Sequence, residues 1–96
     1  MIITNQENVA ALKDILQELE RAKTLHPVWP DDIVHAVAKV TEEAGEALQA
    51  ANDIIEGKGD IEKVETELIH TGAMSIRALV NLRERYGRRK ENRYSL

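Results

Sequence analysis

Five residues with side chains that can bind a metal ion fall in two short segments of the chain. The first segment runs from Lys39 and carries Glu42, Glu43 and Glu46; the second carries Glu67 and His70. Residues three or four apart share one side of a helix, so the three carboxylates of the first segment would repel one another. Mg²⁺ or Mn²⁺ would remove that repulsion, because both ions prefer oxygen ligands. The sequence therefore predicts a metal site between two helices.

Apolar residues recurring at helical spacing predict the helices that position these groups. A capping box at Thr4 and Glu7 opens a helix over about residues 5–24. The stretch His26-Pro-Val-Trp-Pro30 then interrupts the helical pattern, since each proline disfavours helix at the residue before it. Pro30 can occupy the first turn of a second helix, predicted over about 30–56.

Two features shape the predicted pairing of the second and third helices. Gly57 is a natural stop and Asp60 a natural cap, so a tight turn joins the second helix to a third that reaches Gly87. The third helix has two apolar faces, which predicts that it is sandwiched, with a second subunit covering one side. Gly45, inside the second helix, indicates either close helix approach or space for a ligand.

Composition limits the class of protein. The 96 residues suit one small domain with a modest core, here expected to be 1–96 with 87–96 as a flexible basic tail. With no cysteine, disulfides and thiolate metal sites are excluded. No long apolar run or basic leader is evident, so we expect a soluble cytoplasmic protein without a membrane partner. From Arg77 onward there are seven basic and two acidic residues, against six and fifteen before it.

The predicted fold is an all-α antiparallel bundle of about three helices per chain with a basic tail. Long helices with apolar residues on more than one side need further surface on which to bury them. We therefore expect dimerisation or higher oligomerisation to complete the bundle, giving a homodimer or homotetramer.

The stretch Glu42-Glu-Ala-Gly-Glu46, followed by Glu67-x-x-His70, resembles the EExxE…ExxD signature of MazG-like, all-α nucleoside triphosphate pyrophosphohydrolases. The resemblance covers roughly residues 28–80. It implies Mg²⁺-dependent hydrolysis of a nucleoside triphosphate to a monophosphate and pyrophosphate. Many relatives carry a fourth helix, which subunit pairing would have to replace here.

The resemblance also implies roles for individual residues. The metal ligands would be Glu42, Glu43, Glu46, Glu67 and His70. Glu42 or Glu43 could instead be catalytic, orienting or deprotonating the attacking water. Basic side chains would contact phosphate oxygens, and Trp29 would stack on the base. The residues expected to bind substrate are Trp29, His35, Lys39, Lys63, Arg77 and Asn81.

His70 departs from the family pattern, which has Asp at this position. Imidazole is a poorer ligand than a carboxylate for Mg²⁺, and it removes one negative charge from the cluster. We therefore expect weaker Mg²⁺ binding, a preference for Mn²⁺, or loss of activity.

Two other classes of protein are compatible with parts of the sequence. Glu67-x-x-His70 is also the ligand pair of di-iron carboxylate bundles, in which a dimer would supply the full set with Glu43 or Glu46. A non-catalytic helical dimer could instead bind nucleic acid through the basic tail, with salt-dependent affinity. The absence of interleaved aromatic residues argues against nucleic acid as a partner.

Overall fold

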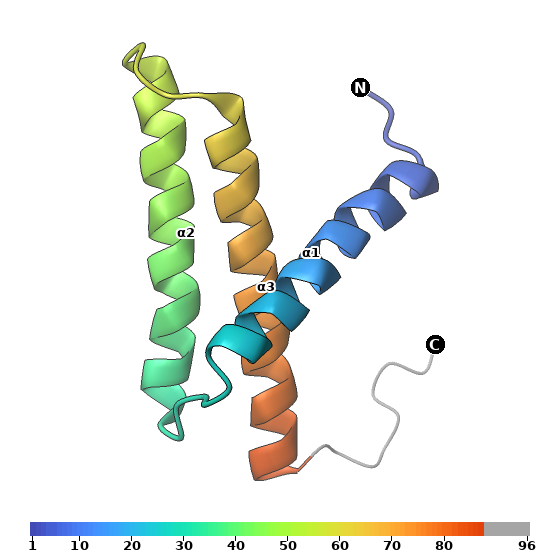
Figure 1. Ribbon diagram of the computed structural model, residues 1–96, viewed down its shortest axis with the longest axis vertical. Helices are drawn as coiled ribbons and strands as arrows, with labels where there is room; N and C mark the ends of the chain where they lie inside the picture. The colour runs from blue at the N-terminus through green and yellow to red at the C-terminus, as the bar shows by residue number, and fades with distance from the viewer. Residues whose placement is uncertain (88–96) are drawn as a thin grey trace.

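The computed structural model describes residues 1–87, which form three helices and no strand (Figure 1). The helices are α1 (Asn5–Leu25), α2 (Ile33–Ile55) and α3 (Ile61–Tyr86). α2 and α3 run antiparallel, and α1 crosses α3 obliquely with its N-terminus pointing away from the pair. The all-α prediction is confirmed. The predicted basic tail falls mostly on 88–96, outside the described residues, so the nucleic-acid alternative stays a prediction.

Side-chain caps fix where the helices begin. The Thr4 hydroxyl accepts a hydrogen bond from the Glu7 backbone N–H, and the Glu7 carboxylate accepts one from the Thr4 N–H at 2.8 Å, so the predicted capping box is confirmed. Asp60 caps α3 in the predicted way. The predicted start of α2 at Pro30 is wrong. Asp32 is the N-cap, because its carboxylate accepts from the His35 N–H at 2.9 Å, and the helix begins after it.

The core is built almost entirely from alanine. Within residues 1–87, the buried apolar side chains are Ala22, Ala36, Ala47, Ala50 and Ala73. α1 and α2 each pack on α3, and within these residues they do not pack on each other. Both helices that flank α3 thus belong to the same chain, where we had expected a second subunit to cover one side.

The glycines show where helices approach most closely. A Cβ placed on Gly72 of α3 would lie 2.9 Å from Cδ1 of Ile15, so the absence of a side chain lets α1 settle against α3. A Cβ on Gly45 of α2 would meet nothing within 4 Å. Within residues 1–87, no other helix comes close to Gly45, so the prediction of close helix approach is wrong there. The other explanation, open space beside the helix, remains.

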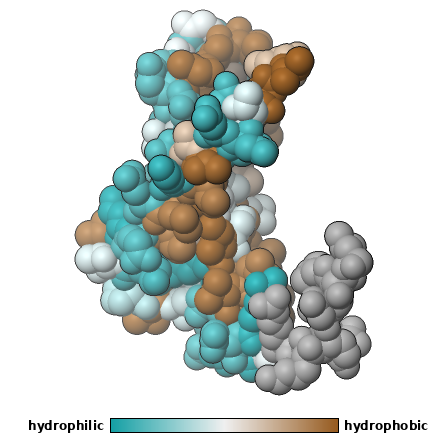
Figure 2. All heavy atoms as spheres, turned by 90° about the vertical axis from the view of Figure 1, so that its right-hand side faces the viewer, coloured by the Kyte–Doolittle hydropathy of each residue, from teal (hydrophilic) through white to brown (hydrophobic). Residues whose placement is uncertain are grey.

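Large apolar side chains remain on the surface of all three helices. On α2 alone, Val34, Val37 and Leu48 are each more than half exposed. On the face shown in Figure 2, brown apolar side chains gather in broad patches between the teal polar ones. None of the helices formed by residues 1–87 carries a stretch apolar enough to span a lipid bilayer.

Candidate metal centre and adjoining cleft

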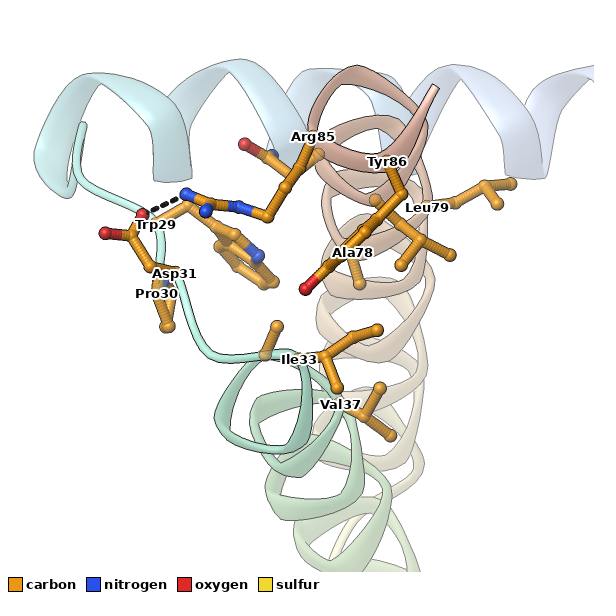
Figure 3. Close-up of a pocket in the computed structure, with 12 residues that line it drawn as sticks. Trp29, Pro30, Asp31, Ile33, Val37, Ala78, Leu79, Arg85 and Tyr86 are labelled. Carbon is orange, nitrogen blue, oxygen red and sulfur yellow. Dashed lines mark hydrogen bonds and ion pairs between the residues drawn. The ribbon is translucent and has the colours of Figure 1, made fainter. Parts of the chain in front are cut away.

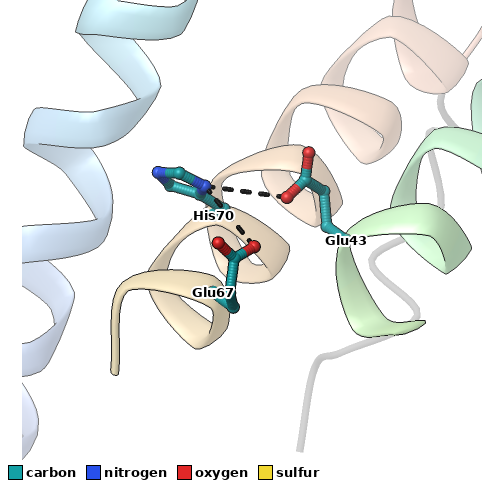
Figure 4. Close-up of side chains that lie close together, drawn as sticks. All are labelled: Glu43, Glu67 and His70. Carbon is teal, nitrogen blue, oxygen red and sulfur yellow. Dashed lines mark ion pairs between the residues drawn. The ribbon is translucent and has the colours of Figure 1, made fainter. Parts of the chain in front are cut away.

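Three of the five predicted ligands meet between α2 and α3. Glu43 lies in the middle of α2, and Glu67 and His70 lie one turn apart on α3, where the His70 ring extends toward α1 with its Nδ1 edge facing the two carboxylates (Figure 4). Nδ1 of His70 is 3.6 Å from Oε2 of Glu43 and 3.8 Å from Oε2 of Glu67. One ligand atom from each residue lies within 4.8 Å of the others, a separation that a single bound ion could bridge.

Burial makes the two carboxylates of this cluster electrostatically costly. The Glu67 side chain is only 4% exposed, and Nζ of Lys63 lies 2.9 Å from its Oε1. This contact with Lys63 holds the pKa of Glu67 below its usual range, so the group is ionised at neutral pH. Oε2 of Glu67 and Oε2 of Glu43 are buried with no hydrogen-bond partner within residues 1–87. Buried carboxylate oxygens without a donor are destabilising unless a cation approaches them.

Glu46 and Glu42 lie at the edge of the cluster. Glu46 is exposed, but contact with the Glu67 carboxyl group, together with the charge of Glu43, raises its pKa. The carboxylates thus crowd as the sequence predicted. Glu42 is exposed and lines the neighbouring cleft, outside the three-residue group.

A cleft of about 450 Å³ opens beside the cluster, lined by all three helices and by the loop that joins α1 to α2. Glu43 and His70 line it, together with Glu42. Of the six residues expected to bind substrate, those that line this cleft are Trp29, Lys39 and Arg77. The lining of the cleft therefore combines three glutamates with three lysine or arginine side chains, Arg21 among them, and one large aromatic ring.

Arg77 and Trp29 make a cation–π contact in the cleft. The Arg77 guanidinium carbon lies 5.0 Å from the centre of the Trp29 ring, and the guanidinium donates a hydrogen bond to the backbone carbonyl of His26. Arg77 is 7% exposed, and this burial lowers its pKa from the usual arginine value. The contact positions the loop between α1 and α2, since it ties both His26 and Trp29 to α3.

The other three expected substrate residues lie elsewhere. Lys63 pairs with Glu67, and His35 is exposed in the first turn of α2. The Asn81 amide donates to the Arg77 backbone carbonyl at 2.8 Å. Asn81 also lines a separate apolar pocket of about 140 Å³ behind Trp29, where Arg85 pairs with Asp31 (Figure 3). The six residues expected to bind substrate therefore do not gather at one site.

Glu18 is the residue of this site that sequence reasoning missed. It lies on α1, its side chain is 13% exposed, and its Oε2 is 3.5 Å from Nε2 of His70. Two hydrogen bonds from Arg21, each 2.8 Å, hold the carboxylate in place and lower its pKa. The available signal was its position between Ile15 and Ala22 on the apolar side of the helix, where an acidic residue needs a partner.

The donor set fits a divalent metal ion. Two carboxylates with unpaired oxygens and one imidazole nitrogen face a common point, and these are ligand types that divalent ions accept. Glu43, Glu67 and His70 would therefore be the ligands, with Glu46 close to both carboxylates and Glu42 outside the group.

Searches against known protein families, curated proteins and solved structures find nothing that matches this chain. The MazG-like resemblance therefore rests on the residues quoted for it.

Proposed function

We propose that the protein is a metal-dependent nucleoside triphosphate pyrophosphohydrolase. The observation that carries the proposal is the convergence of two unpaired carboxylate oxygens and His70 beside a cleft that is also lined by Lys39, Arg77 and Trp29. A substrate with several phosphates and a flat base needs these features side by side. The resemblance of the acidic segments to the MazG-like signature points the same way.

Each residue of the cleft has a role that follows from its place. Glu43, Glu67 and His70 would hold Mg²⁺ or Mn²⁺, which when bound supplies positive charge against the phosphate oxygens. Lys39 is half-buried and has no ion-pair partner within residues 1–87, so its ammonium group can bind phosphate. The Trp29 ring offers its surface to the base.

Glu42 is placed to act on the attacking water. Its carboxylate is exposed, lines the cleft and lies outside the ligand group, so it can accept a proton. Attack of water on the α-phosphorus forms one P–O bond and breaks the bond to the bridging oxygen. The nucleoside monophosphate and pyrophosphate are the two products, and the proton of the water passes to Glu42.

Assembly into a homodimer or homotetramer is part of the same proposal. No large side chain within residues 1–87 is fully buried, while Val34, Leu48 and Ile55 of α2 and Leu68 of α3 are each more than half exposed. Exposed apolar area of this extent indicates an interface. Sedimentation at micromolar concentration tests this, and a strictly monomeric protein would contradict it.

Pyrophosphate release from a panel of standard and modified nucleoside triphosphates, with Mg²⁺ or Mn²⁺, tests the activity. We expect turnover by the wild type and a loss of more than roughly 100-fold in Glu67→Gln, since a direct ligand contributes at least as much as its supporting residues do. Glu65→Gln, an exposed glutamate on the same helix, is the matched control. A folded wild-type protein that releases no pyrophosphate from any nucleotide would refute the proposal.

A further inference from the structure

The two nitrogens of the His70 ring face different carboxylates. Nδ1 is the nitrogen directed at Glu43 and Glu67, and Nε2 points to the opposite side, toward α1 (Figure 4). There Oε2 of Glu18 lies 3.5 Å from Nε2. The imidazole therefore connects α1 to the carboxylate cluster of α2 and α3.

The Glu18 carboxylate is itself fixed in position. Arg21 binds both of its oxygens, through Nε and a terminal nitrogen, and the Glu18 side chain is largely buried. Gly72 allows α1 to lie close enough to α3 for this contact, because no Cβ displaces Ile15. Glu18 is thus a rigid, ionised acceptor beside Nε2.

The hydrogen bond made by one nitrogen of a histidine decides which nitrogen is free to bind a metal ion. When Nδ1, which is directed at Glu43 and Glu67, binds a metal ion, the ring proton lies on Nε2, where Glu18 is placed to accept it. The Oε2 atoms of both carboxylates lack donors, and the Glu67 side chain is more than nine-tenths buried. A metal ion at this point would pair with both oxygens and with Nδ1.

We propose that Glu18, held by Arg21, is a positioning residue that fixes His70 with its proton on Nε2, so that Nδ1 joins Glu43 and Glu67 in binding a borderline transition-metal ion. Imidazole favours such ions over Mg²⁺, so the site selects Mn²⁺, Fe²⁺, Co²⁺ or Zn²⁺. The inference rests on the metal site of the proposed function and defines which ion that site takes.

Metal binding without nucleotide tests the inference. Mn²⁺ and Mg²⁺ affinities are measured by calorimetry on the wild type, Glu18→Ala and Glu18→Gln, with Glu20→Ala as the control because Glu20 is exposed on the same helix. We expect the wild type to prefer Mn²⁺ and Glu18→Ala to lose roughly 10–100-fold in Mn²⁺ affinity. Glu18→Gln should lose less, because its amide oxygen still accepts from Nε2, and Glu20→Ala should match the wild type.

A second variant separates positioning from general stability. In His70→Asp there is no imidazole to orient, so adding Glu18→Ala should leave metal affinity unchanged, and the preference should shift toward Mg²⁺. An equal loss on both backgrounds would show that Glu18 only supports the fold and would overturn the proposal. So would a wild-type affinity for Mn²⁺ that Glu18→Ala does not change.

Nitrogen-15 spectra of the wild-type protein loaded with diamagnetic Zn²⁺ report the tautomer directly. We expect a proton on Nε2 and the shift of a metal-bound nitrogen at Nδ1; the reverse assignment, or an imidazole that Zn²⁺ leaves unchanged, overturns the proposal. Metal binding that depends on Glu18 without any nucleotide turnover would refute the proposed function alone. Nucleotide turnover by a protein whose Mn²⁺ affinity is not changed by Glu18→Ala would refute this inference alone.

Discussion

The aromatic end of the site, where Arg77 meets Trp29, and the acidic end, where Glu43, Glu67 and His70 meet, both use α3 but satisfy their charges in opposite ways. At the aromatic end, Arg77 donates to the His26 carbonyl and stacks on Trp29. At the acidic end, Glu43 and Glu67 keep buried oxygens without donors. The aromatic end stabilises the fold, whereas the acidic end holds like charges close together. Groups that carry a binding function are often those whose charge the fold leaves uncompensated.

The largest effect on stability is expected from Arg77→Met at the aromatic end. The variant loses a charged hydrogen bond and the contact with Trp29, which together should lower the free energy of unfolding by about 2–3 kcal/mol. Chemical denaturation measures this. Arg83→Met, later on the same helix, is the control. A loss equal to that of the control would mean that Arg77 does not hold the loop.

Gly72→Val tests whether the acidic end depends on α1. The added side chain would overlap Ile15, whose Cδ1 would lie only 2.9 Å from the new Cβ, and should destabilise the protein by about 1–3 kcal/mol. Because α1 carries Glu18, Mn²⁺ affinity should fall as well. Gly45→Ala, where a Cβ meets nothing, is the matched control. If Gly72→Val is destabilised but binds Mn²⁺ as tightly as the wild type, then α1 does not contribute to metal binding.

Glu46→Gln should have the opposite effect on stability. The pKa of Glu46 is raised, first by contact with Glu67 and then by the charge of Glu43, so its ionised form opposes folding. A raised pKa gives stability that is present at low pH and lost as the pH rises through it. The variant should therefore melt above the wild type at pH 7 without metal, and this advantage should vanish below about pH 4.

Metal ions should reverse that ranking. Added Mn²⁺ should raise the melting temperature of the wild-type protein more than that of Glu46→Gln, because the ion neutralises the crowded carboxylates. Thermal melts at both pH values, with and without Mn²⁺, measure the effect. If the wild type instead melts above Glu46→Gln at pH 7 without metal, the ionised form of Glu46 does not destabilise the fold, and the prediction is wrong.

The smallest effect is expected in the separate apolar pocket behind Trp29. Arg85 pairs with Asp31 there, but the Asp31 side chain is 85% exposed, so solvent screens the interaction. Asp31→Asn should change the free energy of unfolding by less than about 1 kcal/mol. A larger loss of stability in thermal or chemical denaturation would show that this ion pair, as well as Arg77, holds the loop between α1 and α2 in place.

The sequence by itself determined the helices and most of their ends. Thr4 and Asp60 cap the helices they were predicted to cap, since a cap needs only a side chain and a backbone amide three residues away. The start of α2 was misplaced because Pro30 and Asp32 both suit a helix start, and only the structure shows which residue the backbone uses. The juxtaposition of Glu43, Glu67 and His70 was also predictable, because a short turn forces α2 and α3 to run side by side.

Only the tertiary structure decided what surrounds that cluster. The crossing of α1 over α3 depends on Gly72 meeting Ile15, a contact between residues far apart in the chain, and it brings Glu18 to the second nitrogen of His70. The same folding divides the polar residues of α3, placing Arg77 in the cleft and Asn81 behind it. Helical spacing fixes which residues share a side of one helix, but the angle at which helices cross decides which of those sides meet.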